Sequence, residues 1–213
     1  MTEQATPKCW IVGGTNGSGK SSIYQNSSEL RGSGEFVNAD LVARQISPHN
    51  TDTASLTAGR RVIERLDYLI SKRENFVYET TLSSKQSIEL ISTVRNSGYR
   101  VGLFFVILSN VGLNVKRVHE RVSRGGHSIP DDVIRRRYGR AIANLPIAIR
   151  IAHETVVFDN SGATPVKLVS LVDGNIIQNT LEKATISNCE IAEAIGNALN
   201  LTLDSVFKAA KPS

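Results

Sequence analysis

Short apolar runs alternate with amphipathic stretches along most of the chain. Apolar runs at 9–12, 36–38, 75–78, 101–108 and 155–158 predict strands, and the longest one, at 101–108, is typical of a central strand covered on both faces. Between them, apolar residues recur at helical spacing and predict helices over 21–30, 56–73, 88–96, 111–122 and 130–145, with Ser128 capping the last. This alternation predicts an α/β fold with a doubly wound, mostly parallel sheet flanked by helices.

The pattern changes after residue 164. Two apolar segments, 166–172 and 176–177, flank the turn dipeptide Asp173-Gly174, which predicts an antiparallel hairpin at the sheet edge. A closing helix is expected around 191–199. The chain has 213 residues, so we expect a single P-loop kinase-like domain over 1–213, with the C-terminal hairpin and helix at about 164–213.

The first apolar run leads into a glycine-rich loop. Gly14, Gly19, Lys20 and Ser21 match every fixed position of the phosphate-binding motif G-x-x-x-x-G-K-[ST]. A predicted strand precedes the loop and a predicted helix follows it, which argues against a chance glycine-rich turn. We therefore expect ATP to bind here, with Lys20 bridging its terminal phosphates and the Ser21 hydroxyl ligating Mg²⁺. The expected nucleotide contacts are Gly14, Thr15, Asn16, Gly17, Ser18, Gly19, Lys20, Ser21 and Ser22.

The residues at the strand ends favour phosphoryl transfer over hydrolysis. Hydrolytic and mechanical ATPases normally carry an acidic residue at the end of an apolar strand, where it holds Mg²⁺ through water. The run at 101–108 ends in Ser109-Asn110 without an acid, whereas Asp40 and Glu79 follow two other predicted strands. These two carboxylates are placed to flank an acceptor hydroxyl, one taking its proton while another group orients the acceptor.

Arginine is concentrated after residue 116, although the net charge of the whole chain is only +5. The cluster consists of Arg117, Arg121, Arg124, Arg135, Arg136, Arg137 and Arg140. It could form a solvated helix face, a nucleic-acid patch or a set of phosphate clamps. The phosphate-binding loop favours clamps in a lid at about 121–137, and no aromatic interleaving supports base stacking. We expect Arg121 and one of Arg136 or Arg137 to reach the transferred phosphoryl group, and Arg117 to lie on a solvated face.

Composition adds limits on location. The apolar run at 101–108 is too short to span a bilayer, and residues 1–7 lack the basic start and apolar core of a secretory signal. A cytoplasmic protein without a membrane partner is therefore expected.

Taken in order, these short motifs resemble the zeta-toxin-like kinases, in particular a small stand-alone branch of that family. The matching segments are 13–21, 36–41 with Arg44, 79–83, 121–122 with 125–127, 134–138, 144–145 and 158–161. Zeta toxins use ATP to phosphorylate a sugar hydroxyl of UDP-N-acetylglucosamine.

The resemblance implies roles for individual residues. Asp40 corresponds to the catalytic base, Glu79, Thr81 and Arg44 to residues that hold the acceptor, and the lid arginines to charge clamps. It also implies a small-molecule hydroxyl acceptor and an antitoxin as a partner. Ser83 stands where the toxins carry an acceptor-contacting arginine, so the resemblance implies the transfer but leaves the acceptor open. A P-loop NTPase, or a kinase acting on nucleic acid, is the alternative function.

Overall fold

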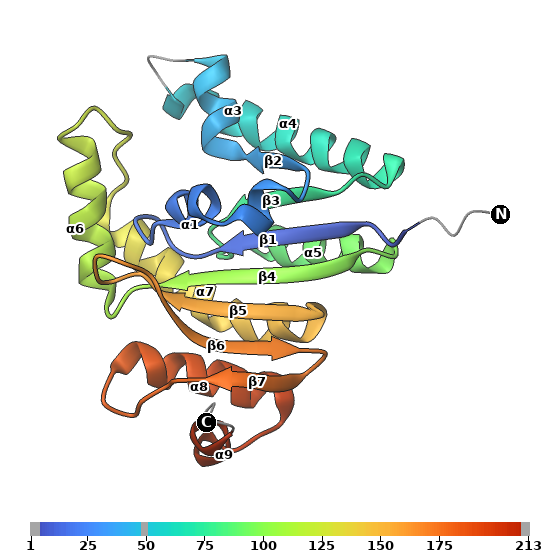
Figure 1. The fold of residues 1–213 in the computed structure, drawn as a ribbon. Coiled ribbons are helices and arrows are strands. Elements are labelled where there is room, and N and C mark those ends of the chain that lie inside the picture. The colour runs from blue at the N-terminus through green and yellow to red at the C-terminus, as the bar shows by residue number, and fades with distance from the viewer. Residues whose placement is uncertain (1–4, 48–50, 210–213) are drawn as a thin grey trace.

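The computed structural model describes residues 5–47 and 51–209, and at residues 44 and 51–55 it describes the backbone alone. Within these ranges the strands form one sheet in the order β2-β3-β1-β4-β5-β6-β7 (Figure 1). Strands β1 to β5 run parallel, while β6 and β7 form an antiparallel hairpin beside β5. The strands are β1 Lys8–Gly13, β2 Glu35–Asn38, β3 Phe76–Thr80, β4 Arg100–Ile107, β5 Glu154–Asp159, β6 Val166–Val172 and β7 Asn175–Asn179. The predicted mostly parallel sheet and its C-terminal hairpin are confirmed.

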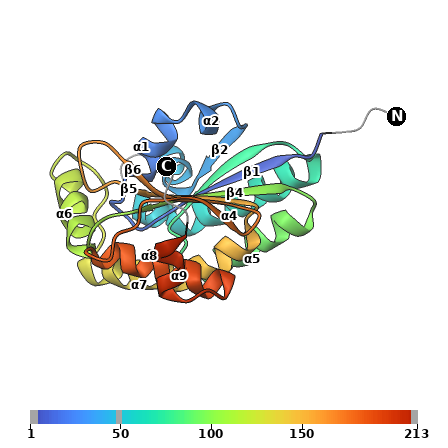
Figure 2. The same cartoon turned by 60° about the horizontal axis from the view of Figure 1, so that its bottom comes forward.

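Helices cover the two faces of this sheet unequally (Figure 2). One face carries α4 Thr51–Lys72, α5 Lys85–Asn96, α7 Asp131–Ile151, α8 Ile186–Leu199 and α9 Leu203–Lys208. The other face carries α1 Lys20–Asn26 and α2 Ser28–Arg31. The remaining two are α3 Ala39–Ile46, which packs on α4, and α6 Val111–Val122, which stands at the carboxyl ends of the strands. No described helix combines the length and the apolar character needed to cross a membrane.

The larger core lies under the five-helix face. Leu66 of α4, Ile91 of α5 and Leu145 of α7 are fully buried against strand residues such as Leu103 and Phe105. On the opposite face, Trp10 lies directly over Gly102, where an added Cβ would stand 2.0 Å from the indole ring. Glycine at 102 is therefore required by the packing of β1 on β4.

The structure corrects two details of the predicted helices and adds one. The helix expected at 21–30 breaks at Ser27, whose Oγ accepts a hydrogen bond from the Leu30 amide at 3.2 Å and caps α2. Ser128 does not cap α7, because the helix begins after Pro130, whose fixed φ of −58° leads the chain directly into the first turn. The short helix α9 was not expected from the sequence.

Candidate active site

The loop between β1 and α1 has a backbone that only glycine adopts without strain. Gly14, Gly17 and Gly19 have φ angles of +142°, +78° and +91°. A Cβ at Gly14 would lie 2.3 Å from the Val106 carbonyl oxygen, and one at Gly17 would lie 2.5 Å from the Asn114 carbonyl oxygen. The loop therefore packs against β4 and α6 and leads into the N-terminus of α1, where free amides favour an anion.

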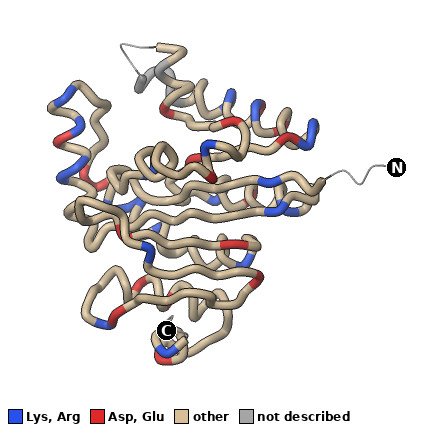
Figure 3. The backbone as a smooth tube through the Cα atoms, in the orientation of Figure 1, with Lys and Arg blue, Asp and Glu red and all other residues tan. Residues whose placement is uncertain are grey.

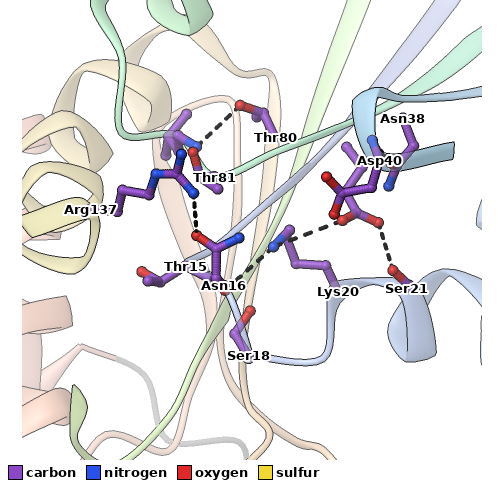
Figure 4. Close-up of polar contacts among 12 residues, drawn as sticks. Thr15, Asn16, Ser18, Lys20, Ser21, Asn38, Asp40, Thr80, Thr81 and Arg137 are labelled. Atoms are coloured by element: carbon purple, nitrogen blue, oxygen red, sulfur yellow. Dashed lines mark hydrogen bonds and ion pairs between the residues drawn. The ribbon is translucent and has the colours of Figure 1, made fainter. Parts of the chain in front are cut away.

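Side chains from three other elements fix the outer side of this loop. Asn114 of α6 is fully buried and donates to the Asn16 carbonyl oxygen at 2.9 Å. Asn160, just after β5, donates to the Ser18 carbonyl oxygen at 2.8 Å. Arg137 of α7 donates to the Asn16 Oδ1 at 2.9 Å (Figure 4). The loop is thus held in shape before any phosphate arrives, which lowers the entropic cost of binding.

Lys20 and Ser21 both face the carboxylate of Glu79. The Lys20 Nζ lies 3.8 Å from Glu79 Oε1 and donates to the Thr15 carbonyl oxygen at 3.3 Å. The Ser21 Oγ donates to Glu79 Oε2 at 3.0 Å. Burial lowers the pKa of Lys20, and the nearby Glu79 and Asp40 charges oppose that effect. Glu79 therefore acts as the counter-ion of Lys20 and at the same time orients the Ser21 hydroxyl.

Asp40 stands at the start of α3, on the Lys20 side of the site (Figure 4). The buried Asn38 caps this helix, because its Oδ1 accepts from the Asp40 amide at 2.7 Å and from the Leu41 amide at 3.1 Å. The cap fixes the backbone of Asp40 while its side chain remains solvent-exposed. The cap therefore fixes where the Asp40 side chain leaves the backbone, at the wall of the site.

These side chains meet around one cavity of about 250 Å³ at the carboxyl ends of the strands. Its wall includes Lys20, Asp40, Glu79, Thr81 and Arg137, all of which were predicted as site residues. The Thr81 Oγ1 lies 2.8 Å from the Ser83 Oγ at the rim. Parallel α/β sheets bind their ligands at this edge, and the cavity adjoins the phosphate-binding loop.

The arginine cluster divides between the site and the solvent. Arg137 is half-buried, and burial lowers its pKa. Arg136, one position along α7, is exposed and lies 3.7 Å from Asp132 on the solvent side of the helix. Arg137 follows the buried Ile134 by three residues, so the helical period places it on the inward side. That spacing is the sequence signal that separates the two arginines.

Arg121 lies at the end of α6 and does not line the cavity of about 250 Å³. Its charge contributes to lowering the pKa of Lys20, as does that of Arg137. Its Nη2 donates to the His127 carbonyl oxygen at 3.0 Å, while its buried Nε finds no hydrogen-bond partner among the described residues. The Ser18 Oγ in the loop is likewise buried without such a partner within the described ranges. Of these two unsatisfied atoms, the Ser18 Oγ lies in the phosphate-binding loop itself, where a bound phosphate could supply the missing partner.

Two other predicted residues differ from expectation or lie outside the description. Arg117 does not lie on a freely solvated face, because it is half-buried and donates to the Ser161 carbonyl oxygen at 3.1 Å. It ties α6 to the loop after β5, which a helical pattern alone could not reveal. The side chain of Arg44 lies outside the part of the structure that is described, although its backbone belongs to α3. Figure 3 shows Lys and Arg positions along α6, at the carboxyl edge of the sheet.

The order of the strands explains which strand end brings an acidic side chain to the Ser21 hydroxyl, the expected Mg²⁺ ligand. In a hydrolytic ATPase this acid would be expected at the end of an apolar strand such as β4, which borders β1 on one side. The other neighbour of β1 is β3, and Glu79 lies near its end, paired in register with Val12. Strand order is a tertiary property, so the composition of the two strands could not show which of them would face Ser21.

The sheet order, the glycine loop and the cavity define a P-loop kinase fold. The family model described as Zeta toxin matches residues 1–166. The chain therefore belongs to the zeta toxin family, and this membership supports an ATP-dependent kinase.

One relative and two solved structures are similar to this chain. An uncharacterized protein of Haemophilus influenzae is 34% identical over 128 residues, which are 59% of this chain and 88% of the relative. A crystal structure of AvrRxo1-ORF1 and -ORF2 with ATP has a TM-score of 0.64 and 16% identity; the match covers 94% of this chain and spans 66% of the length of that one. The PezAT toxin-antitoxin system of Streptococcus pneumoniae has a TM-score of 0.57 and 18% identity, covering 76% of this chain and 72% of that one. At such identities these structures show a shared fold.

Proposed function

We propose that this protein transfers the γ-phosphoryl group of ATP to a hydroxyl of a small molecule. The observation that carries the proposal is the cavity of about 250 Å³, which brings Asp40, Lys20 and Arg137 together beside the phosphate-binding loop. A cavity of this size can hold part of a small acceptor.

Each residue has a chemical task in this reaction. Asp40 accepts the proton as the acceptor oxygen attacks the γ-phosphorus, and the bond from that phosphorus to the bridging oxygen of ADP breaks. Lys20, Arg121 and Arg137 stabilise the charge that spreads over the equatorial oxygens. Thr81 is proposed to hold the acceptor, and the side chain of Arg44 remains a candidate for the same role.

The residues at Ser21 fit a magnesium ion. Mg²⁺ prefers oxygen ligands, and the Ser21 hydroxyl lies 3.0 Å from a carboxylate oxygen of Glu79. We therefore assign Ser21 as the ligand and Glu79 as the carboxylate that orients it and holds the hydration shell of the ion. Mg²⁺, when bound, would supply positive charge that offsets the negative charge of the phosphates. This assignment moves Glu79 from the acceptor side of the site, which the resemblance implied, to the metal side.

The acceptor is proposed to be a UDP-activated amino sugar, on the strength of the family alone. The test is ATP consumption with UDP-N-acetylglucosamine, UDP-glucose, N-acetylglucosamine or uridine, with each product identified by mass spectrometry. We expect phosphorylation of one of these, and a fall in kcat of about 10²- to 10⁴-fold for Asp40→Asn at unchanged ATP affinity. Turnover without any acceptor would instead favour an NTPase. A steep salt dependence of polynucleotide binding would favour a kinase acting on nucleic acid.

A protein partner belongs to the same proposal. PezAT is a toxin-antitoxin system, which supports an antitoxin as the partner of this chain. A cytoplasmic location, where ATP is available, accompanies the proposed activity.

A further inference from the structure

A second cavity adjoins the proposed active site. It measures about 220 Å³ and lies between α4 and α5, over β3. Ala39 and Tyr78 line both this cavity and the one that contains Asp40. Each cavity is smaller than a typical small-molecule site of roughly 300–1,000 Å³, but together they fall within that range.

The wall of the second cavity is mainly apolar. Val62, Ile63 and Leu66 of α4 face Leu90 of α5 across it, and the half-buried Tyr78 lies at the boundary with the first cavity. Burial raises the pKa of Tyr78, so its ring stays neutral at physiological pH. Protein interiors normally close such spaces, and apolar cavities that remain open bind apolar molecules.

A glycine borders this space. Gly59 lies inside α4 and lines the cavity, and a Cβ built on it meets no atom of the described residues within 4 Å. Its φ lies outside the left-handed region, and no close backbone approach requires it. Apart from proline, glycine is the residue that weakens a helix interior most. Gly59 shares these properties with Gly139 of α7, but only Gly59 lies on the wall of the cavity, where its lack of a side chain leaves space that a larger residue would fill.

We propose that the cavity between α4 and α5 binds an apolar ring carried by the acceptor, while the acceptor's hydroxyl reaches Asp40. This inference rests on the proposed transfer to a hydroxyl, and it favours acceptors that carry a hydroxyl and an apolar ring over a UDP-activated amino sugar, whose rings are polar. Gly59 then determines specificity, because it sets the size of the ring that enters. Tyr78 provides an aromatic wall for that ring.

The test compares Gly59→Leu with Gly139→Leu in the full-length chain. Gly139 is an exposed interior residue of α7 whose added Cβ also meets no atom within 4 Å, so it matches Gly59 in helix propensity but lies outside the cavity. Leucine is a good helix former, and both variants should keep or raise Tm by about 1–4 °C. Only the leucine at 59 should fill the cavity.

The probe is benzyl alcohol, which joins an apolar ring to a primary hydroxyl, followed by backbone NMR. In the wild type we expect shifts at the amides of α4, α5 and Tyr78. Gly59→Leu should weaken binding by about tenfold or more, as a misfit of one methylene or more does in an apolar pocket, and Gly139→Leu should not. Binding that is unchanged in Gly59→Leu, lost equally in both variants or absent in the wild type would overturn the proposal.

The link to catalysis is tested separately. For the acceptor that the transfer assay identifies, Gly59→Leu should raise the acceptor KM by about tenfold or more and leave the KM for ATP unchanged. An unchanged acceptor KM would overturn the assignment of the ring to this cavity. Absence of transfer to every acceptor, in protein that still binds ATP and benzyl alcohol, would instead contradict the kinase proposal itself.

Discussion

Replacing Glu79 by glutamine tests the centre of the site with almost no change of shape. Glutamine keeps an oxygen that can accept from Ser21, so the substitution chiefly removes the charge that faces Lys20 at 3.8 Å. At an effective dielectric constant of about 20, the attraction over that distance is ~4 kcal/mol. Because the pair lines a cavity that water can enter, we expect about half of this, ~2 kcal/mol, to be lost from the free energy of unfolding, lowering Tm by about 4–8 °C.

Bound ATP should restore part of the stability that Glu79→Gln loses. In the free protein Glu79 neutralises Lys20, whereas bound phosphates would take over that task and be repelled by the carboxylate. With ATP and EDTA, we therefore expect Glu79→Gln to bind ATP about tenfold more tightly than the wild type, equivalent to ~1.4 kcal/mol. Mg²⁺ should then strengthen ATP binding in the wild type and much less in the variant, because the carboxylate that holds its hydration shell is gone.

Differential scanning calorimetry gives Tm, and isothermal titration calorimetry with and without Mg²⁺ gives the affinities. Glu120→Gln is the matched control, because it removes a carboxylate from an exposed pair with Lys116 at 4.0 Å and should change Tm by less than about 2 °C. Equal Mg²⁺ dependence in the wild type and in Glu79→Gln would refute the metal-side assignment. If the acceptor KM rose instead, Glu79 would belong to the acceptor, as the family resemblance implies.

Two further predictions concern the arginines and the pH dependence of stability. Arg137→Ala should lower kcat by about 10²-fold or more while Arg136→Ala leaves it nearly unchanged, and equal small losses measured in the transfer assay would contradict the clamp. Burial, aided by the charges of Arg95 and Arg100, lowers the pKa of His153, whose Nδ1 accepts from a backbone amide at 3.0 Å. The unfolded chain then binds the extra proton more readily, so Tm should fall as the pH drops through about 6.5 and level off below the folded-state pKa. His153→Gln should flatten that part of the Tm profile between about pH 7.5 and 5, and a wild-type profile without such a fall would contradict the reasoning.

The sequence predicted what depends on local pattern. Helical and strand periods, the glycine loop and the turn at Asp173-Gly174 are properties of short segments, and the structure confirms the elements they indicate, except that the helix expected at 21–30 is divided at Ser27. Asp40, Glu79 and Thr81 could be expected at one site, because the carboxyl ends of parallel strands share an edge. Their meeting around one cavity agrees with that expectation.

What the sequence left open depends on tertiary placement. Neighbouring residues on a helix point about 100° apart, so choosing Arg137 over Arg136 requires knowing which side of α7 is buried. Placing Glu79 beside Ser21 requires knowing that β3, and not only β4, borders β1. The cavity beside Gly59 depends on how the successive helices α4 and α5 pack over β3, which their individual hydrophobic patterns do not determine.

The packing of Trp10 on Gly102 provides this protein with its own optical reporter. Trp10 is the single tryptophan of the chain, and only 5% of it is exposed. Trp10 lies on β1, the strand that leads into Gly14. Its ring meets that of Phe104, on β4, edge-on with the ring centroids 5.0 Å apart. Indole emission therefore comes from one position, between the central strands at the base of the loop. A red shift of that emission will report loss of the central sheet in unmodified protein, without attaching a dye near the site.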